Sequence, residues 1–234
     1  MSNLQLLLVS TSTVYGRPYL GYLEEECRDF FKDRVRILFV PFARPGGMSH
    51  DAYTAKARAV FAQWGFELKG AHEFDSAEDG TAWAEGFFTG GGNTFVLADT
   101  LRKTGYFEAI DRAVRNGTPY MGTSAGCNMA GLTIGTTNDM PIVYPPSFDA
   151  FGWVPFNMNP HYLDPQEGST HMGETRETRI AEFHHFNDQP VLGLREGSWL
   201  RIQDGTTVLK GPHSARWFEK DQPAKEITTW NSEV

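Results

Sequence analysis

The sequence predicts an α/β fold built around a mainly parallel β-sheet with helices on both faces. Up to Ala130, short apolar segments alternate with segments of helical pattern, as in sheets whose parallel strands are joined by crossover helices. Apolar residues make up 40% of the 234 residues and aromatic residues 13%, which is enough for a substantial core. Near the C-terminus, the dipeptide Asp204-Gly205 lies between two apolar segments and predicts a β-hairpin, and therefore antiparallel strands. No linker, repeat or low-complexity tract divides the chain, so one domain over residues 1–234 is expected.

The first half contains short apolar segments that are typical of buried strands. They are residues 4–9, 35–40, 66–71, 86–89 and 118–121. Helical patterns lie between them, at residues 19–32, 49–64, 94–103 and 106–116, with Ser49 as an N-cap candidate. Glycines follow three of these segments, as expected at helix ends. Residues 75–85 fit neither pattern clearly.

The second half has a different pattern. Extended segments are expected at residues 140–144 and 153–159, with prolines between them, and a helix at residues 174–187. Strands are expected at residues 191–194, 199–203 and 207–210, the last two joined by the hairpin turn. The polar tail after Phe218 shows no clear pattern.

Charge and cysteine content limit the class of protein. The formal net charge of −8 argues against nucleic acid or an anionic membrane as the main partner. The two cysteines, Cys27 and Cys127, suggest no disulfide framework and fit a reducing compartment. The apolar run at residues 4–9 is too short for a signal-peptide core or a membrane span. A soluble cytoplasmic protein is therefore expected.

A G-x-S-x-G box occupies residues 122–126, after a strand-like segment and before helix-compatible residues. This context is typical of a nucleophile elbow, in which glycines permit a sharp turn and the serine hydroxyl is exposed. Ser124 is the candidate nucleophile, and the N-terminus of the following helix would favour developing negative charge. The box alone is weak evidence, since glycine and serine are common in loops.

A serine nucleophile needs a base, and His161 is the strongest candidate. It follows an extended segment, and strand ends are where parallel sheets place their sites, although a surface loop histidine is the alternative. The adjacent His184 and His185 are expected on a solvated helix face. No cysteine or histidine spacing resembles a metal site, so neither a metal nor another cofactor is expected.

The run Gly90-Gly91-Gly92 follows a strand and precedes a helix, so it offers backbone N–H groups to an anion. It could bind phosphate, although neither G-x-x-x-x-G-K-[ST] nor G-x-G-x-x-G is present. It could form an oxyanion hole, in which Gly91 or Gly92 and Ala125 each contribute an N–H. A tight turn without a ligand is the third possibility.

Taken together, five motifs resemble the serine peptidase family that includes peptidase E, an aspartyl dipeptidase, and cyanophycinase. The motifs are, in chain order, GGGNTF at 90–95, GTSAG at 122–126, TTNDMPIV at 136–143, NPH at 159–161 and GETR at 173–176. The resemblance spans residues 4–218 and is weakest between His161 and Gly173 and in the tail. It implies a three-layer α/β sandwich like that of class I glutamine amidotransferases (flavodoxin-like), and metal-free hydrolysis of dipeptides with an N-terminal aspartate.

The resemblance also implies roles for individual residues. Arg176 would bind the aspartyl side chain of the substrate, a task that suits a guanidinium fork; the alternative is a solvated helix start with exchangeable ion pairs. Cys127 is expected to be a small buried residue and not the nucleophile. Two carboxylates could complete the triad: Glu196, just after the strand at 191–194, and Asp139, inside the motif at 136–143 and just ahead of its extended part.

We favour Glu196 over Asp139 and expect the other to be structural. Alternatively, Glu196 could be an exposed turn residue paired with Arg195, and Asp139 could cap local backbone N–H groups. The expected partner is a small peptide substrate, and the protein is expected to be a monomer or small homo-oligomer. Two alternative functions are a cyanophycinase-like or isoaspartyl peptidase of the same family and a non-catalytic small-molecule-binding protein with the same fold.

Overall fold

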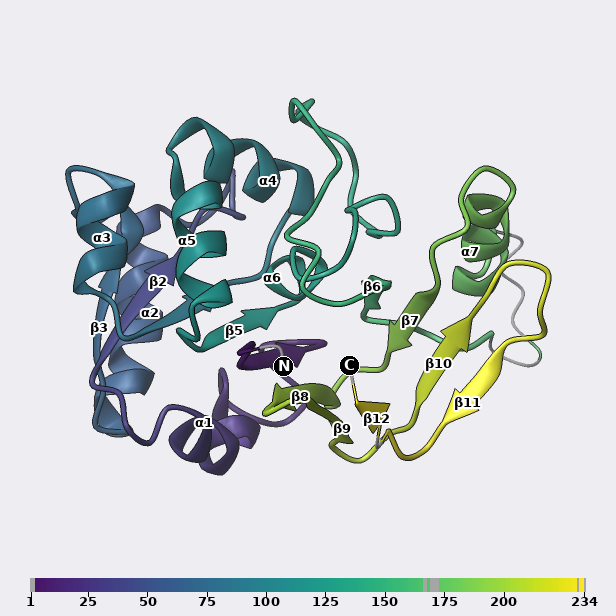
Figure 1. Cartoon of the computed structure of the whole chain (residues 1–234), viewed down its shortest axis with the longest axis horizontal. Helices are drawn as coiled ribbons and strands as arrows, with labels where there is room; N and C mark the ends of the chain where they lie inside the picture. The colour runs from purple at the N-terminus through teal and green to yellow at the C-terminus, as the bar shows by residue number, and fades with distance from the viewer. Residues whose placement is uncertain (1–2, 166–167, 169–172, 231, 234) are drawn as a thin grey trace.

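The computed structural model describes residues 3–165, 168, 173–230 and 232–233, which form two β-sheets and their helices (Figure 1). The main sheet has eight strands in the order β12-β9-β8-β1-β5-β4-β2-β3. Five of them run parallel to one another: β1 (Leu6–Val9), β2 (Arg36–Val40), β3 (Glu67–Gly70), β4 (Gly86–Thr89) and β5 (Tyr120–Thr123). The others are antiparallel to their neighbours: β8 (Trp199–Gln203), β9 (Thr206–Lys210) and β12 (Ser232–Glu233). The mainly parallel sheet predicted from the sequence is therefore present.

A second sheet of four strands lies beside the main sheet, on the right in Figure 1. Its order is β11 (Lys225–Ile227), β10 (Ala215–Phe218), β7 (Val191–Leu194) and β6 (Asn157–Pro160). Only β6 and β7 are parallel, so their carboxyl ends lie at the same edge of this sheet.

Helices cover both faces of the main sheet, because alternate side chains of its buried strands point to opposite faces. On one face, Leu7, Phe39 and Phe88 pack with residues of α1 (Glu24–Phe30, after a 3₁₀ turn at Gly21–Leu23) and α2 (His50–Gln63). The other face carries α3 (Ala77–Trp83), α4 (Thr94–Lys103), α5 (Tyr106–Arg115) and the short α6 (Ala125–Asn128). A further 3₁₀ turn is at Ala71–Glu73, and α7 (Arg176–His184) lies next to the second sheet. The result is three layers, as expected.

Local signals placed several elements correctly. Ser49 is the N-cap of α2, where its hydroxyl accepts a hydrogen bond from the N–H of Ala52. Asp204 and Gly205 both have positive φ, 53° and 76°, as a two-residue type I′ hairpin turn requires between β8 and β9. The undecided segment at residues 75–85 contains α3, which Ser76 caps by accepting from the N–H of Asp79.

Other expectations were wrong, each for an identifiable reason. Residues 140–144 form no strand, and Met140 and Tyr144 are exposed. The strand expected at 153–159 begins only at Asn157, because the N–H groups of Trp153 and Val154 both donate to the carbonyl of Ala130, next to α6, and not to a neighbouring strand. The tail, for which the sequence predicts no element, contains β11, which pairs with β10 through its backbone; its side chains stay largely exposed, so it leaves no apolar pattern in the sequence.

Within the described part of the chain, no helix combines the length and the apolar character needed to cross a membrane.

Candidate active site

Ser124 stands on a sharp turn between β5 and α6, at the middle of the main sheet. Its backbone has φ 53° and ψ −110°, a conformation that non-glycine residues rarely adopt and that is often found at functional sites. The flanking glycines are required by close contacts. A Cβ at Gly122 would lie 2.4 Å from the carbonyl oxygen of Gly126, and one at Gly126 would lie 2.5 Å from that of Thr89. Strand, turn and helix therefore have the arrangement of a nucleophile elbow.

Ser124, His161 and Glu196 form a chain of hydrogen bonds. His161 Nε2 lies 2.9 Å from Ser124 Oγ, and His161 Nδ1 lies 2.6 Å from Glu196 Oε1. In the neutral ring, Nδ1–H would donate to the carboxylate, which leaves Nε2 to accept the serine proton. His161 directly follows β6 and Glu196 lies two residues after β7, so the parallel pairing of these strands brings both side chains to one edge. The base and its carboxylate thus come from the second sheet, and the serine from the main sheet.

Solvent reaches this chain of groups from the carboxylate side. The side chain of Glu196 is 50% exposed and that of His161 36% exposed. A carboxylate this exposed incurs only a small desolvation penalty and can hold the imidazole through a hydrogen bond.

Asp139 lies in a different network from the His161 ring. Its Oδ2 accepts hydrogen bonds from the backbone N–H of Thr94 at 2.8 Å, from the Thr94 hydroxyl at 2.6 Å and from the Thr137 hydroxyl at 3.0 Å. Thr94 is the first residue of α4, so Asp139 satisfies an N–H group at a helix N-terminus, where a negative charge is also favoured. Of the two carboxylates considered from the sequence, the structure places Glu196 on the histidine and Asp139 at the start of α4.

The glycine run lies against the nucleophile. A Cβ at Gly91 would lie 2.9 Å from the Cβ of Ser124. Among the described residues, the N–H groups of Gly91, Gly92 and Ala125 have no hydrogen-bond acceptor. Tyr53 donates from its buried hydroxyl to the carbonyl of Gly91 at 3.3 Å, which orients the peptide between Gly91 and Gly92. Unpaired N–H groups thus occur on both sides of Ser124, as an oxyanion hole requires.

Arg176 is the first residue of α7, after Thr175, which caps the helix by accepting from the N–H of Thr178. Its guanidinium is partly buried, and no carboxylate of a described residue lies within ion-pair distance of it. Burial lowers the pKa of Arg176 from its usual value, the nearby charge of Arg179 lowers it further, and Asp139 acts in the opposite direction. A partly desolvated cation with no ion-pair partner among the described residues favours an anionic ligand.

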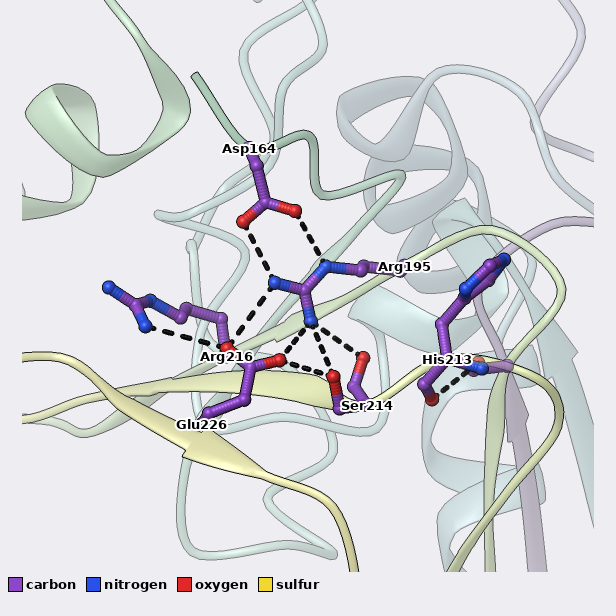
Figure 2. Close-up of polar contacts among 7 residues, drawn as sticks. Asp164, Arg195, His213, Ser214, Arg216 and Glu226 are labelled. Atoms are coloured by element: carbon purple, nitrogen blue, oxygen red, sulfur yellow. Dashed lines mark hydrogen bonds and ion pairs between the residues drawn. The ribbon is translucent and has the colours of Figure 1, made fainter. Parts of the chain in front are cut away.

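Arg195, which directly follows β7 and precedes Glu196, is held in a network of hydrogen bonds and ion pairs (Figure 2). Its guanidinium donates twice to Asp164, both times at 2.8 Å, and also to the Ser214 carbonyl at 2.8 Å and to Glu226. The sequence alternative in which Arg195 pairs with Glu196 is therefore wrong. The bidentate bond to Asp164 ties the segment after His161 to the strand end that carries Glu196.

Cys127 and His184 are both buried. Burial raises the pKa of the Cys127 thiol far above its usual value, so the reactive thiolate is not formed and the residue is a packing element, as expected. The expectation of a solvated face was wrong for His184, whose Nε2 lies 3.0 Å from the carbonyl of Gln189. Within the described residues, no group of three or more histidine, cysteine or acidic side chains is placed to hold a metal ion.

Sequence reasoning missed two residues that contact this site. Ser10 immediately follows β1, but serine is common after strands, so this position is too weak a signal to have identified it. Tyr53 lies inside α2 among other buried side chains, and nothing in the sequence distinguishes it. Of the loop between His161 and Gly173, where the family resemblance is weakest, residues 166–167 and 169–172 lie outside the described residues.

Comparisons with known proteins identify the family of this chain. Residues 6–210 match the model of peptidase family S51. The chain is 49% identical to a peptidase E of Streptomyces coelicolor, over 96% of this chain and 91% of that protein. It is 44% identical to a probable alpha-aspartyl dipeptidase of Drosophila melanogaster, over 95% and 92% of the two chains.

Two solved structures share the fold. A putative peptidase E from Listeria monocytogenes superposes with a TM-score of 0.68 at 19% identity, covering 89% of this chain and 98% of that one. A peptidase from an acI-B1 actinobacterium superposes with a TM-score of 0.72 at 18% identity, covering 96% and 94%.

Proposed function

Because this chain belongs to peptidase family S51, we propose that it is a serine dipeptidase that hydrolyses dipeptides with an N-terminal aspartate. The observation that carries this proposal is the hydrogen-bonded chain from Ser124 Oγ through the His161 ring to Glu196. A serine, a histidine and a carboxylate in this order supply the nucleophile, the general base and the group that orients the base. The names of the relatives from Streptomyces and Drosophila support a dipeptidase of this kind.

The proposed reaction proceeds through an acyl-enzyme. Ser124 Oγ bonds to the peptide carbonyl carbon while His161 Nε2 takes the hydroxyl proton, and His161 then gives this proton to the leaving nitrogen as the C–N bond breaks. His161 Nε2 then takes a proton from water, whose oxygen bonds to the ester carbon, and returns this proton to Ser124 Oγ as the ester C–O bond breaks and the aspartate leaves. Glu196 supports the imidazolium formed in each step. The N–H of Ala125, together with that of Gly91 or Gly92, would bind the negatively charged oxygen of each tetrahedral intermediate.

A panel of three dipeptides tests this proposal against its rivals. We expect rapid hydrolysis of Asp-Leu, with no loss of rate in EDTA, and far slower hydrolysis of β-Asp-Arg and Asn-Leu. Preference for β-Asp-Arg would instead identify a cyanophycinase-like or isoaspartyl peptidase. Binding of a peptide without hydrolysis of any would indicate a non-catalytic binding protein.

We assign Arg176 to the substrate's aspartyl carboxylate, because it is a partly buried guanidinium without an ion-pair partner among the described residues. Arg176→Ala should lower kcat/KM for Asp-Leu by about 10- to 150-fold, the equivalent of roughly 1.5–3 kcal/mol for a hydrogen bond to a charged group. The Tm should change little, since no ion pair is lost.

The matched control is Arg179→Ala, one turn along the same helix, where the arginine is half-exposed and lies 3.7 Å from Glu174. It should keep a nearly unchanged rate. Measuring both variants with Asp-Leu and Asn-Leu decides the assignment. An equal loss on the two substrates in Arg176→Ala would mean that Arg176 does not read the aspartate.

We further propose that residues 1–234 form one peptidase domain, because the chain passes repeatedly between the two sheets. The two free, buried cysteines and the net charge of −8 favour a cytoplasmic location, without nucleic acid or membrane as partner. A monomer or small homo-oligomer is proposed, and sedimentation would establish which.

Ser124, His161 and Glu196 provide every proton transfer of the proposed reaction, so we propose that the reaction uses no metal or other cofactor.

A further inference from the structure

Ser10 joins the ends of three strands beneath the candidate active site. It directly follows β1 and is completely buried. Its hydroxyl donates to the carbonyl of Leu194 at 2.7 Å and accepts from the backbone N–H of His161 at 2.9 Å. One hydroxyl therefore bridges the backbone of His161, directly after β6, and the end of β7, two residues before Glu196.

The residue before Ser10 holds the nucleophile. The carbonyl of Val9 accepts the backbone N–H of Ser124 at 3.0 Å. Consecutive residues at the end of β1 thus bind the backbones of the nucleophile and of the base. Since Ser124 follows a strand of the main sheet and His161 a strand of the second, this dipeptide is a short direct link between their backbones.

His161 needs such support because its backbone is strained. Its φ of 55° lies in the left-handed region, which is costly for residues other than glycine and persists only where neighbouring contacts enforce it. The contacts present are the bond from its own N–H to Ser10 and the bond from the N–H of Tyr162 to the carbonyl of Leu194, at 3.2 Å.

We propose that Ser10 is a positioning residue for hydrolysis, whose hydroxyl fixes the backbone of His161 against Ser124 and against the strand end that carries Glu196. This inference rests on the proposed function, because it assigns His161 the role of base. The alternative is that Ser10 only stabilises the junction between the two sheets. The two roles differ in what happens to the chemical step when the hydroxyl is removed.

Ser10→Ala should lower kcat for Asp-Leu by about 10- to 100-fold, the range found when a supporting hydrogen bond behind a functional group is removed. KM should stay within about twofold, because no substrate contact is lost. Ser10→Thr keeps the hydroxyl and should recover most of the rate. If Ser10→Thr has the Tm of the wild type but is as slow as Ser10→Ala, the hydroxyl does not position the base.

The matched control is Ser198→Ala. Ser198 is also completely buried, and its hydroxyl likewise donates to one backbone carbonyl, that of His213 at 2.8 Å, and accepts from one backbone N–H, that of His213 at 3.1 Å. It contacts neither Ser124 nor His161 through this hydroxyl. Ser198→Ala should lower the Tm about as much as Ser10→Ala does while leaving kcat within about threefold of the wild type.

A second measurement does not depend on the substrate. Phenylmethanesulfonyl fluoride forms a bond between its sulfur and Ser124 Oγ, fluoride leaves, and the base takes the serine proton, so the rate of labelling reports the Ser124–His161 pair. Mass spectrometry should show labelling of Ser124 slowed in Ser10→Ala and unchanged in Ser198→Ala. Equal labelling rates in the two folded variants would overturn the role of Ser10. If the wild type is labelled at a normal rate but hydrolyses Asp-Leu slowly, the proposed substrate is wrong and the role of Ser10 is not affected.

Discussion

Replacing Ser124 by alanine will abolish hydrolysis of Asp-Leu and leave the fold intact. Without the nucleophile no acyl-enzyme can form, and only binding and the oxyanion donors remain, which typically leave a residual acceleration of about 10³–10⁴ over the uncatalysed reaction. The side chain is small and partly exposed, and alanine is strained no more than serine at φ 53°, so the Tm should stay close to that of the wild type. Steady-state kinetics together with thermal unfolding would measure both effects.

Cys127→Ala provides the control for this experiment. It removes the other nucleophilic atom near the elbow, from a fully buried position in the core. We expect some loss of stability from the small cavity, roughly 1 kcal/mol, and a largely preserved rate. Turnover in purified Ser124→Ala, or its loss only in Cys127→Ala, would contradict the serine mechanism.

Replacing Glu196 by glutamine should have the second-largest effect, a fall in kcat of up to about 10⁴-fold. Glutamine keeps the shape of the side chain but removes the negative charge, and it can present an N–H group to Nδ1 and so favour the wrong tautomer of His161. The side chain is half-exposed, so the folded structure should lose little stability. The expected signature is a low rate at a normal Tm.

Asp139→Asn should show the opposite signature. It weakens the hydrogen bonds to Thr94 and Thr137 and removes a negative charge from the N-terminus of α4, for a cost of about 0.5–2 kcal/mol in stability. Its rate should fall far less than that of Glu196→Gln. A normal rate in Glu196→Gln with a severe loss in Asp139→Asn would reverse the assignment of the two carboxylates.

Much of the first half of the fold could be predicted because each element carries its own local signal. The glycine-flanked helix α4 and the strand β4 have the bounds that the sequence predicts. The second half could be predicted only in part. Short strands such as β6 and β7 show where the chain is extended, but their apolar patterns do not identify their partners. That they pair with each other in a separate sheet depends on contacts between distant parts of the chain.

The same limit applies to the candidate site. Ser124 could be found from a local motif, and His161 and Glu196 from their positions after strands. The contribution of Ser10 could not be inferred in the same way, because its partners lie 151 and 184 residues away. Serine is also common after strands, so its residue type alone indicates nothing.

The passage of the chain between the two sheets has a consequence for protein synthesis. After β5, the chain builds β6 and β7 in the second sheet, returns to the main sheet for β8 and β9, and leaves it again for β10 and β11. Ser124 emerges from the ribosome 37 residues before its base and well before β8, the antiparallel neighbour of β1. A growing or prematurely ended chain therefore exposes the serine without the groups that activate it. The proposed triad is complete only after Glu196, the last of its three residues, has been translated and both sheets have folded around it.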